Sequence, residues 1–248
     1  MMDTISSYKT EILKTAFALS SLEASDRQIS QFAVYSDLLE EWNKKMNLTA
    51  INDFHEVVTK HFIDSLSVMF SHVVKTKNIS GKAVDIGTGA GFPGIPLKIM
   101  FPDLDITLVD SLNKRIEFLN IVIKELGLKK IRAVHCRAED FGQDPVNRER
   151  FNLCVSRAVA DLSVLSELCI PLLAKGGLFL SYKAGNAEEE IIRADRAIKV
   201  LGGSRIAAEE LILPGTDIKR TLVIVNKIDH TPKKFPRKAG MPKKSPIR

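Results

Sequence analysis

The spacing of apolar and polar residues along this chain changes at Gly81. Before Gly81 the apolar residues recur at helical spacing. Ser25 and Asp26 offer an N-cap for the second helix. No strand pattern occurs in this part, so residues 1–78 are expected to form a helical extension. Its three predicted helices span residues 5–22, 29–46 and 53–74.

After Gly81, short apolar runs alternate with helical segments. The runs predict strands at 82–86, 104–110, 131–136, 151–156 and 178–183. Helices are expected between them at 95–101, 114–126, 161–173 and 187–201. This alternation is typical of a parallel sheet covered by helices on both faces. Two further runs, 209–213 and 221–228, flank a Pro-Gly turn and predict a hairpin. We therefore expect an α/β domain at 79–229, with a mostly parallel seven-stranded sheet and an antiparallel last strand.

Residues 230–248 differ from the rest in charge. They hold seven basic residues and no acidic one, so the first 229 residues contribute −1 to the chain's net charge of +6. Four prolines in this segment favour an extended tail over a packed element. Such a tail is typical of contact with a phosphate backbone or an anionic surface, although a solvated solubility tail is the alternative. The candidate RNA-binding residues are Lys233, Lys234, Arg237, Lys238, Lys243 and Lys244.

The overall composition bounds the class of protein only loosely. Apolar residues make up 45% and charged residues 27% of the 248 residues, as in ordinary soluble domains. The three cysteines form no Cys-x-x-Cys pair and the five histidines do not cluster with them. We expect no metal, reduced buried cysteines and a cytoplasmic location. No apolar run approaches the roughly 20 residues that cross a bilayer, so we expect no membrane contact. The oligomeric state stays open, with a monomer slightly favoured.

The strongest chemical motif is V-D-I-G-T-G-A-G-F-P-G at residues 84–94, between a predicted strand and a predicted helix. Three glycines at alternate positions allow a ligand to approach the backbone closely. A dinucleotide site would have its third glycine where this chain has Phe92. Asp85 would oppose a pyrophosphate, whereas it would favour the sulfonium and ammonium groups of S-adenosylmethionine. The motif therefore favours S-adenosylmethionine over NAD, with Asp85, Gly87, Gly89 and Gly91 as candidate cofactor-binding residues.

Two further acids follow the next predicted strands. Asp110 ends the second strand, 19 residues past Gly91, where an acid commonly holds ribose hydroxyls. Its alternative role is to cap the helix that begins near Asn113, a role that Ser111 could also fill. Glu139 follows the third strand, where an adenine edge would lie, but could equally be a surface acid.

The segment after the fourth strand, Ser156 to Ala160, is expected to face the methyl acceptor. It lacks the Asn/Asp-Pro-Pro-aromatic turn of enzymes that methylate amino groups of bases. Methylation at cytosine C5 needs a cysteine nucleophile, and Cys154 lies inside a predicted buried strand. Transfer to guanine N7 needs alignment rather than a base, since its lone pair is already available. Arg157 could position cofactor or substrate, or could form a structural salt bridge.

These residues resemble the bacterial 16S ribosomal RNA (guanine-N7) methyltransferases, the RsmG or GidB family. The resemblance covers nearly the whole chain in order, with one departure at residues 182–185, where the family has Lys directly followed by Gly. The matching stretches are Asn47-Leu48-Thr49, His61-Phe62-Ile63-Asp64-Ser65-Leu66, Asp85 through Pro96, Asp110-Ser111-Leu112-x-Lys114-Arg115, Arg137-Ala138-Glu139, Ser156-Arg157-Ala158 and Arg237-Lys238-x-Gly240-x-Pro242.

The resemblance implies a Rossmann-like class I methyltransferase that uses S-adenosylmethionine. It implies transfer to N7 of one guanine in 16S ribosomal RNA, as naked RNA or in an assembling small subunit. It places His61 and Asp64 near the pocket mouth, whereas helix packing with a capping partner is the plainer interpretation. The implied cofactor contacts are Gly87, Phe92, Asp110, Ser111, Leu112, Ala138, Glu139 and Arg157.

Two alternatives stay open at this point. One is a methyltransferase of the same fold that acts on another RNA, a small molecule or a protein. The other is an RNA-binding protein whose cofactor site has decayed. Asp85, the three glycines and Asp110 argue against decay, and the basic tail argues against a small-molecule substrate.

Overall fold

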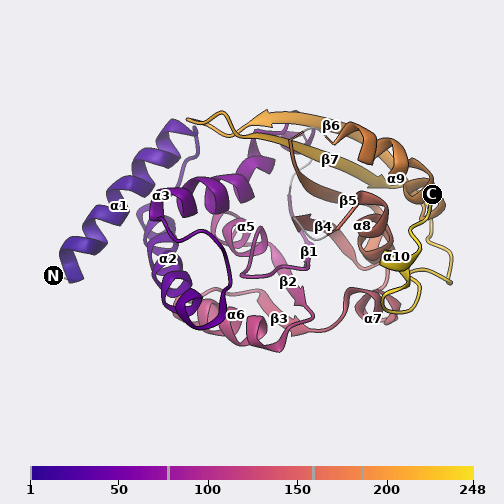
Figure 1. Ribbon diagram of the computed structural model, residues 1–248, viewed down its shortest axis with the longest axis horizontal. Coiled ribbons are helices and arrows are strands. Elements are labelled where there is room, and N and C mark those ends of the chain that lie inside the picture. Colours follow the sequence, from indigo (N-terminus) through magenta and orange to yellow (C-terminus); the bar gives the residue numbers. More distant parts are fainter. Residues whose placement is uncertain (1, 77–78, 158–159, 186) are drawn as a thin grey trace.

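The computed structural model describes residues 2–76, 79–157, 160–185 and 187–248. Their strands form one seven-stranded sheet in the order β3-β2-β1-β4-β5-β7-β6. The first five strands run parallel, and β7 is antiparallel to both of its neighbours, which confirms the predicted fold class (Figure 1). The strands are β1 (Lys82–Ile86), β2 (Asp105–Asp110), β3 (Ile131–His135), β4 (Phe151–Arg157), β5 (Leu173–Ala184), β6 (Gly203–Ile212) and β7 (Lys219–Lys227).

Two strands, β5 and β6, begin well before the apolar runs that predict them. β5 starts at Leu173, which pairs with Phe151 before the register shifts. Gly177 lies at this irregularity, where a Cβ would come within 2.9 Å of the Phe151 carbonyl oxygen. β6 starts at Gly203, although its first residues form no apolar run, because backbone pairing with β7 needs no particular side chain.

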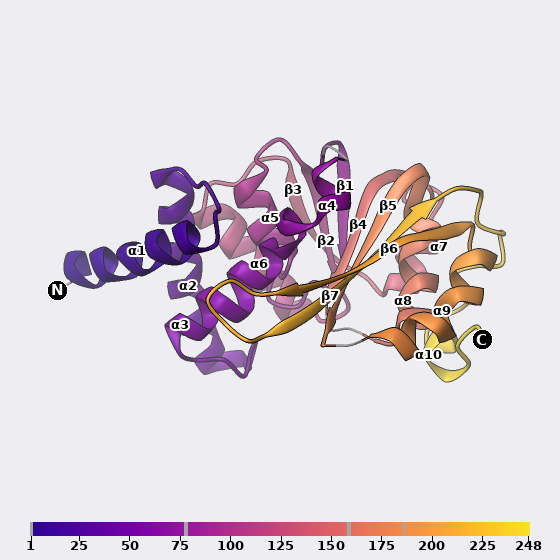
Figure 2. The same cartoon turned by 90° about the horizontal axis from the view of Figure 1, so that it is seen from above.

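Helices cover both faces of the sheet, so the domain has three layers (Figure 2). One hydrophobic cluster joins the sheet to α2 (Asp26–Met46), α5 (Gly94–Met100) and α6 (Asn113–Glu125). The other joins it to α7 (Ala138–Gln143), α8 (Leu162–Cys169) and α9 (Glu188–Val200). Residues of β1 alternate between the clusters, since Ala83 belongs to the first and Val84 to the second.

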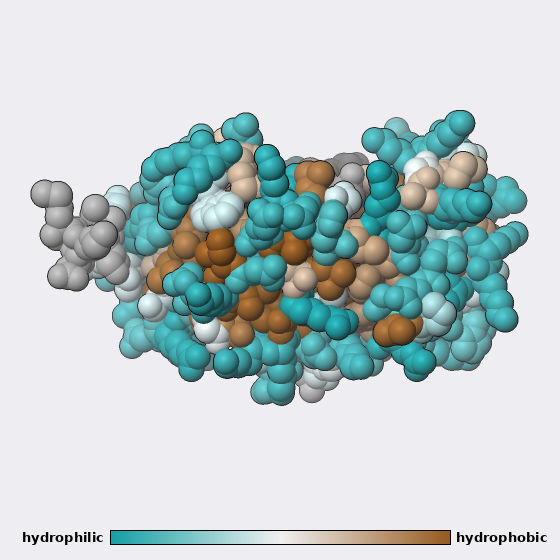
Figure 3. Space-filling view, turned by 90° about the horizontal axis from the view of Figure 1, so that it is seen from below, coloured by the Kyte–Doolittle hydropathy of each residue, from teal (hydrophilic) through white to brown (hydrophobic). Residues whose placement is uncertain are grey.

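The N-terminal extension shares the first of these clusters. Ser25 caps α2 with a capping box completed by Gln28, as expected for the second helix, while α1 (Met2–Leu19) packs against α2. The third predicted helix is broken into four pieces: α3 (Phe54–Val57), a π-helical turn η1 (Val58–Ile63), a 3₁₀ segment η2 (Leu66–Phe70) and α4 (His72–Lys75). On the side of the molecule where α2, α6 and β3 lie, apolar side chains reach the surface among polar ones (Figure 3). No helix in the described ranges is long and apolar enough to span a bilayer.

The expectation of an extended C-terminal tail was wrong. Residues 230–248 fold back beside α7 and α8 and end in a short helix, α10 (Met241–Lys244) (Figure 1). The guanidinium of Arg148 donates hydrogen bonds to the carbonyls of Thr231, Pro232 and Phe235. Arg237 forms an ion pair of 2.6 Å with Glu167, whose side chain is 1% exposed. The segment packs on the domain despite its polar composition, because it buries apolar side chains and places Arg237 beside the distant Glu167 carboxylate.

Replacing Arg237 with alanine should destabilise the protein, because it leaves the Glu167 carboxylate buried without its partner. Breaking such a pair costs about 3 kcal/mol of unfolding free energy. Lys238→Ala is the matched control: this neighbour is exposed, and its loss should change stability by less than about 0.5 kcal/mol. Denaturant unfolding of both variants measures the difference. Equal stability of Arg237→Ala and the parent protein would show that the ion pair does not hold the segment.

Candidate active site

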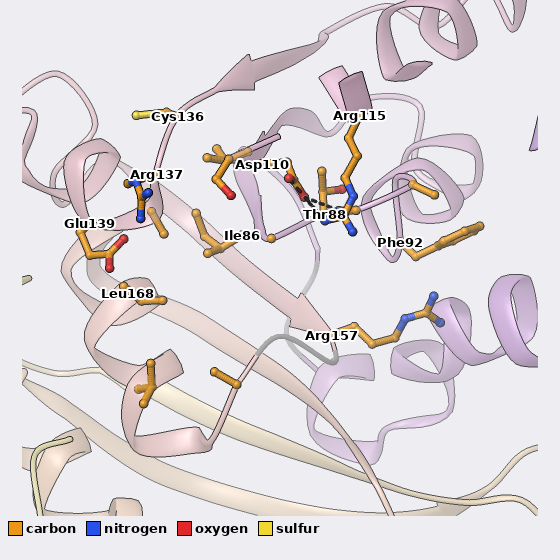
Figure 4. A pocket seen from close by; sticks show the side chains of 18 of the residues that line it. Ile86, Thr88, Phe92, Asp110, Arg115, Cys136, Arg137, Glu139, Arg157 and Leu168 are labelled. Atoms are coloured by element: carbon orange, nitrogen blue, oxygen red, sulfur yellow. Dashed lines mark hydrogen bonds and ion pairs between the residues drawn. The ribbon is translucent and has the colours of Figure 1, made fainter. Parts of the chain in front are cut away.

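A cavity of about 590 Å³ opens at the carboxyl ends of β1 to β4, the edge at which open α/β sheets bind ligands. Its size is within the roughly 300–1,000 Å³ of small-molecule pockets. Figure 4 shows Asp110 with Arg115, Arg137 with Glu139, and Arg157 beside Phe92 around this space. The walls come from six separated parts of the chain, which contribute Leu48, Thr49 and His61; Ile86 to Ala90 and Phe92; Val109 to Ser111 and Arg115; Cys136 to Glu139; Arg157, Ala160, Val164 and Leu168; and Gly240 with Lys243.

The glycine loop after β1 forms one wall of the pocket. Gly87, Gly89 and Gly91 have φ of 69°, 61° and 104°, a region that favours glycine. A Cβ on Gly91 would come within 2.8 Å of the Tyr35 hydroxyl oxygen. That hydroxyl donates a hydrogen bond of 2.6 Å to the Ala90 carbonyl. Helix α2 therefore supports the loop from behind, and only glycine allows this approach.

Asp85 lies behind the loop and does not line the pocket. Its Oδ2 accepts hydrogen bonds from the Thr88 hydroxyl at 2.7 Å and from the Gly94 N–H at 2.8 Å. Burial raises the pKa of Asp85 to about 7, and these two bonds partly oppose the rise. The expected direct contact of Asp85 with a cationic ligand is thus absent from this geometry. The carboxylate instead occupies the first turn of α5, where a phosphate would bind.

Asp110 lines the pocket at the end of β2. Its carboxylate accepts hydrogen bonds from the Gly89 N–H at 2.9 Å and the Leu112 N–H at 3.0 Å, and it pairs with Arg115 at 3.1 Å. Arg115 Nη1 also donates to Asp110 Oδ1, but at 3.5 Å this bond is long, and a ligand hydroxyl could take its place on Oδ1. Leu112 contributes only its backbone N–H, which holds the Asp110 carboxylate in place.

The far end of the pocket lies between α7 and the C-terminal segment. Ala138 and Glu139 begin α7 and line the pocket together with Gly240 and Lys243. The Gly240 N–H donates a hydrogen bond of 2.8 Å to Glu139 Oε1. The last residues of the chain therefore complete this wall, which the expectation of a separate tail did not include.

Arg157 lies at the mouth of the pocket, at the end of β4. Its Nη1 contacts Asp64 Oδ2 at 3.2 Å, and Asp64 also pairs with Arg220 of β7 at 2.9 Å. The guanidinium lies 5.1 Å from the centre of the Phe92 ring, on which the His61 imidazole stacks at 4.5 Å. Asp64 is buried and does not line the pocket, so it acts on the mouth through Arg157.

The surroundings of His61 keep its imidazole neutral. Burial and, to a smaller extent, the positive charge of Arg157 together lower the pKa of His61 to about 3. So weak a base does not accept a proton near neutral pH. Neither Cys136 nor Cys154 offers a thiolate, because burial raises the pKa of both. Cys136, expected to be buried, is partly exposed and lines the pocket.

The structure brings most of the sequence-predicted site residues together. Those that line the pocket are His61, Gly87, Gly89, Phe92, Asp110, Ser111, Ala138, Glu139, Arg157 and Lys243. Those that do not are Asp64, Asp85, Gly91, Leu112, Lys233, Lys234, Arg237, Lys238 and Lys244. Ala158 and Val159 lie outside the described residues.

Sequence reasoning assigned no role to several pocket residues: Leu48, Thr49, Thr88, Arg115, Cys136, Arg137 and Gly240. Most belong to stretches that carry the family resemblance, which was the available signal. Spacing alone did not show that these side chains would meet.

Comparison with known proteins gives one consistent family. Residues 28–216 match the family described as rRNA small subunit methyltransferase G. The ribosomal RNA small subunit methyltransferase G of Alkaliphilus metalliredigens is 48% identical over 96% of this chain and 98% of its own length. The protein of the same name from Acetivibrio thermocellus is 50% identical over 90% of each chain.

A solved structure shows the same fold at much lower sequence identity. The geranyl diphosphate C-methyltransferase of Streptomyces coelicolor, crystallised with S-adenosyl-L-homocysteine, is 14% identical and has a TM-score of 0.50. The match covers 66% of this chain and 77% of that one. The fold is thus that of class I methyltransferases, and the sequence matches place this chain in the rRNA small subunit methyltransferase G family.

Proposed function

We propose that this protein transfers a methyl group from S-adenosylmethionine to N7 of one guanine in 16S ribosomal RNA. The observation that carries the proposal is the pocket: a glycine loop and a ribose-type acid lie inside it, and its mouth holds a neutral imidazole and a guanidinium. Family membership over nearly the whole chain supports ribosomal RNA as the substrate. Because the substrate named for the relatives is ribosomal RNA, we propose that the protein acts in the cytoplasm, on 16S RNA or an assembling subunit.

The pocket residues fit S-adenosylmethionine better than a dinucleotide. A pyrophosphate would need the first N–H groups of α5, but the Gly94 N–H is already bonded to Asp85. Gly89 has open space where a Cβ would be, so a ligand can lie against the loop. Asp110 would hold ribose hydroxyls, Ala138 and Glu139 the adenine, and the loop the methionine part. When bound, the cofactor supplies an electrophilic methyl group.

The chain's own residues would align the acceptor rather than activate it. Guanine N7 carries a free lone pair and loses no proton on methylation, so orientation and exclusion of water are the main requirements. Both carboxylates at the pocket already accept backbone N–H groups, and His61 is too weak a base. Phe92, His61 and Arg157 form a rigid mouth that Asp64 fixes.

The exposed cations of the C-terminal segment would bind the RNA backbone. Lys233, Lys234, Lys238, Lys243 and Lys244 are exposed, and Lys243 lies at the pocket itself. Their charges would attract phosphates and release condensed counterions. Arg237 is already engaged with Glu167, so we assign it to stability instead.

Cells that lack the gene should lose a single 7-methylguanosine from 16S ribosomal RNA. Mass mapping of ribosomal RNA from cells with and without the gene identifies the position. Purified protein with S-adenosylmethionine should restore the mark in RNA or small subunits from the deletion strain. A methyl group found on another atom, or on no ribosomal RNA, would contradict the proposed function.

Asp110→Ala should weaken binding of S-adenosylmethionine about 10- to 100-fold, since a hydrogen bond to a charged group contributes roughly 1.5–3 kcal/mol. Asp103→Ala, which removes a fully exposed acid, is the matched control and should bind normally. Calorimetry with S-adenosylmethionine, S-adenosylhomocysteine and NAD measures these affinities. The assignment fails if Asp110→Ala binds normally while its melting temperature is unchanged, or if the parent protein binds NAD alone.

Single-turnover rates should vary less than about threefold between pH 6.5 and 8.5, because no side chain must accept a proton. His61, with its pKa of about 3, stays neutral throughout this range. Cofactor and RNA must be saturating, because titration of Asp85 near pH 7 could otherwise change their affinity and so the observed rate. A steep rise governed by one pKa would instead indicate a general base and an acceptor other than N7.

A further inference from the structure

A chain of hydrogen bonds leads from Arg157 through His61 to Thr49 at the mouth of the pocket. Arg157 Nη2 lies 3.4 Å from His61 Nδ1, and His61 Nε2 lies 2.8 Å from Thr49 Oγ1. All three side chains line the pocket. The proposed function gives Thr49 no role.

The direction of these bonds follows from the chemistry of the groups. A guanidinium can only donate, so His61 Nδ1 must accept and carries no proton. The neutral imidazole then holds its proton on Nε2. That N–H donates to Thr49 Oγ1. Thr49 Oγ1 is therefore the acceptor in the last of these two hydrogen bonds, because Arg157 can only donate to the first.

A second donor fills the remaining lone pair of Thr49. The Ile51 N–H donates to Thr49 Oγ1 at 3.1 Å. A hydroxyl oxygen accepts at most two hydrogen bonds, and both positions are now used. The hydroxyl can take part in a further hydrogen bond only as a donor, and the residue lies at the pocket wall.

The backbone around Thr49 is held in place. The Asn43 side chain, near the end of α2, bonds both polar groups of the Thr49 backbone. Its Nδ2 donates to the Thr49 carbonyl at 2.8 Å, and its Oδ1 accepts from the Thr49 N–H at 2.8 Å. The hydroxyl is thus a donor of fixed position and fixed direction.

We propose that the Thr49 hydroxyl donates a hydrogen bond to O6 of the target base and so selects guanine. This inference rests on the proposed function, which brings the N7 edge of a guanine into the pocket. On that edge guanine presents two acceptors, N7 and O6, side by side. Adenine presents N7 beside an amino group, which is a donor and would face the Thr49 proton. A donor fixed in this position can bond to O6 of guanine, whereas it would face another donor in adenine. The hydroxyl therefore favours guanine.

The bond to O6 orients the base rather than activating it. N7 gains positive charge during transfer, which makes O6 a weaker acceptor, so the interaction does not strengthen in the transition state. Thr49 is therefore a specificity-determining residue, and its effect belongs in kcat/KM and in discrimination between bases.

The test combines protein variants with a changed base. Small-subunit RNA is assembled with guanine or 2-aminopurine, which keeps N7 but lacks O6, at the mapped position. Thr49→Val should lower kcat/KM on the guanine substrate about 10- to 100-fold, since an unpaired polar group costs roughly 1–3 kcal/mol. Thr49→Ser keeps the hydroxyl and should stay within about threefold of the parent. Thr76→Val, the same change at an exposed threonine outside the pocket, is the matched control and should leave kcat/KM unchanged.

On the 2-aminopurine substrate the parent protein should be slowed, and Thr49→Val should cause no further loss. Equal loss on both substrates would show that Thr49 is only structural and would overturn the inference, as would an unchanged rate for Thr49→Val on guanine. Calorimetry of Thr49→Val with S-adenosylmethionine should show normal affinity. Product analysis separates the two claims: methylation away from N7 defeats the proposed function, whereas N7 methylation without coupling between Thr49 and O6 defeats this inference alone.

Discussion

The geometry of the pocket mouth depends on one buried carboxylate between two guanidinium groups. Asp64, just after the π-helical turn η1, pairs with Arg157 at the end of β4 and with Arg220 on β7. This ion network joins the helical extension to two strands of the sheet. Buried charges are stable only when their partners are placed accurately, so the network fixes the extension on the domain. The same contact aims Arg157 at Phe92 and His61.

The break in the third predicted helix has a place in this arrangement. A regular helix through residues 53–74 would space its side chains by 3.6 residues per turn. The π-helical turn carries His61 and ends immediately before Asp64, which changes how the two side chains are presented. His61 faces the pocket while Asp64 faces the two arginines. Such π-turns inside helices are frequent at functional sites.

Much of the fold followed from local patterns, since β1 to β4 are apolar runs bounded by helical segments. The patterns failed where long-range contacts decide the structure. The C-terminal segment folds because Arg237 meets Glu167, 70 residues earlier in the sequence. In the site, the glycine loop and Asp110 were predictable from their spacing. The placement of Asp85 was not, because a motif names the residue but does not tell which side of the loop its carboxylate occupies.

The place of the C-terminal segment has a consequence for genetics. Every strand of the sheet ends before residue 230, so a stop codon or frameshift there leaves the coding region for the whole sheet intact. It nevertheless removes Gly240 and Lys243 from the pocket wall, and with them the hydrogen bond to Glu139. A lesion that leaves every strand of the sheet intact is easily scored as harmless. Truncation after residue 229 would therefore alter the pocket wall, as a substitution in the glycine loop would.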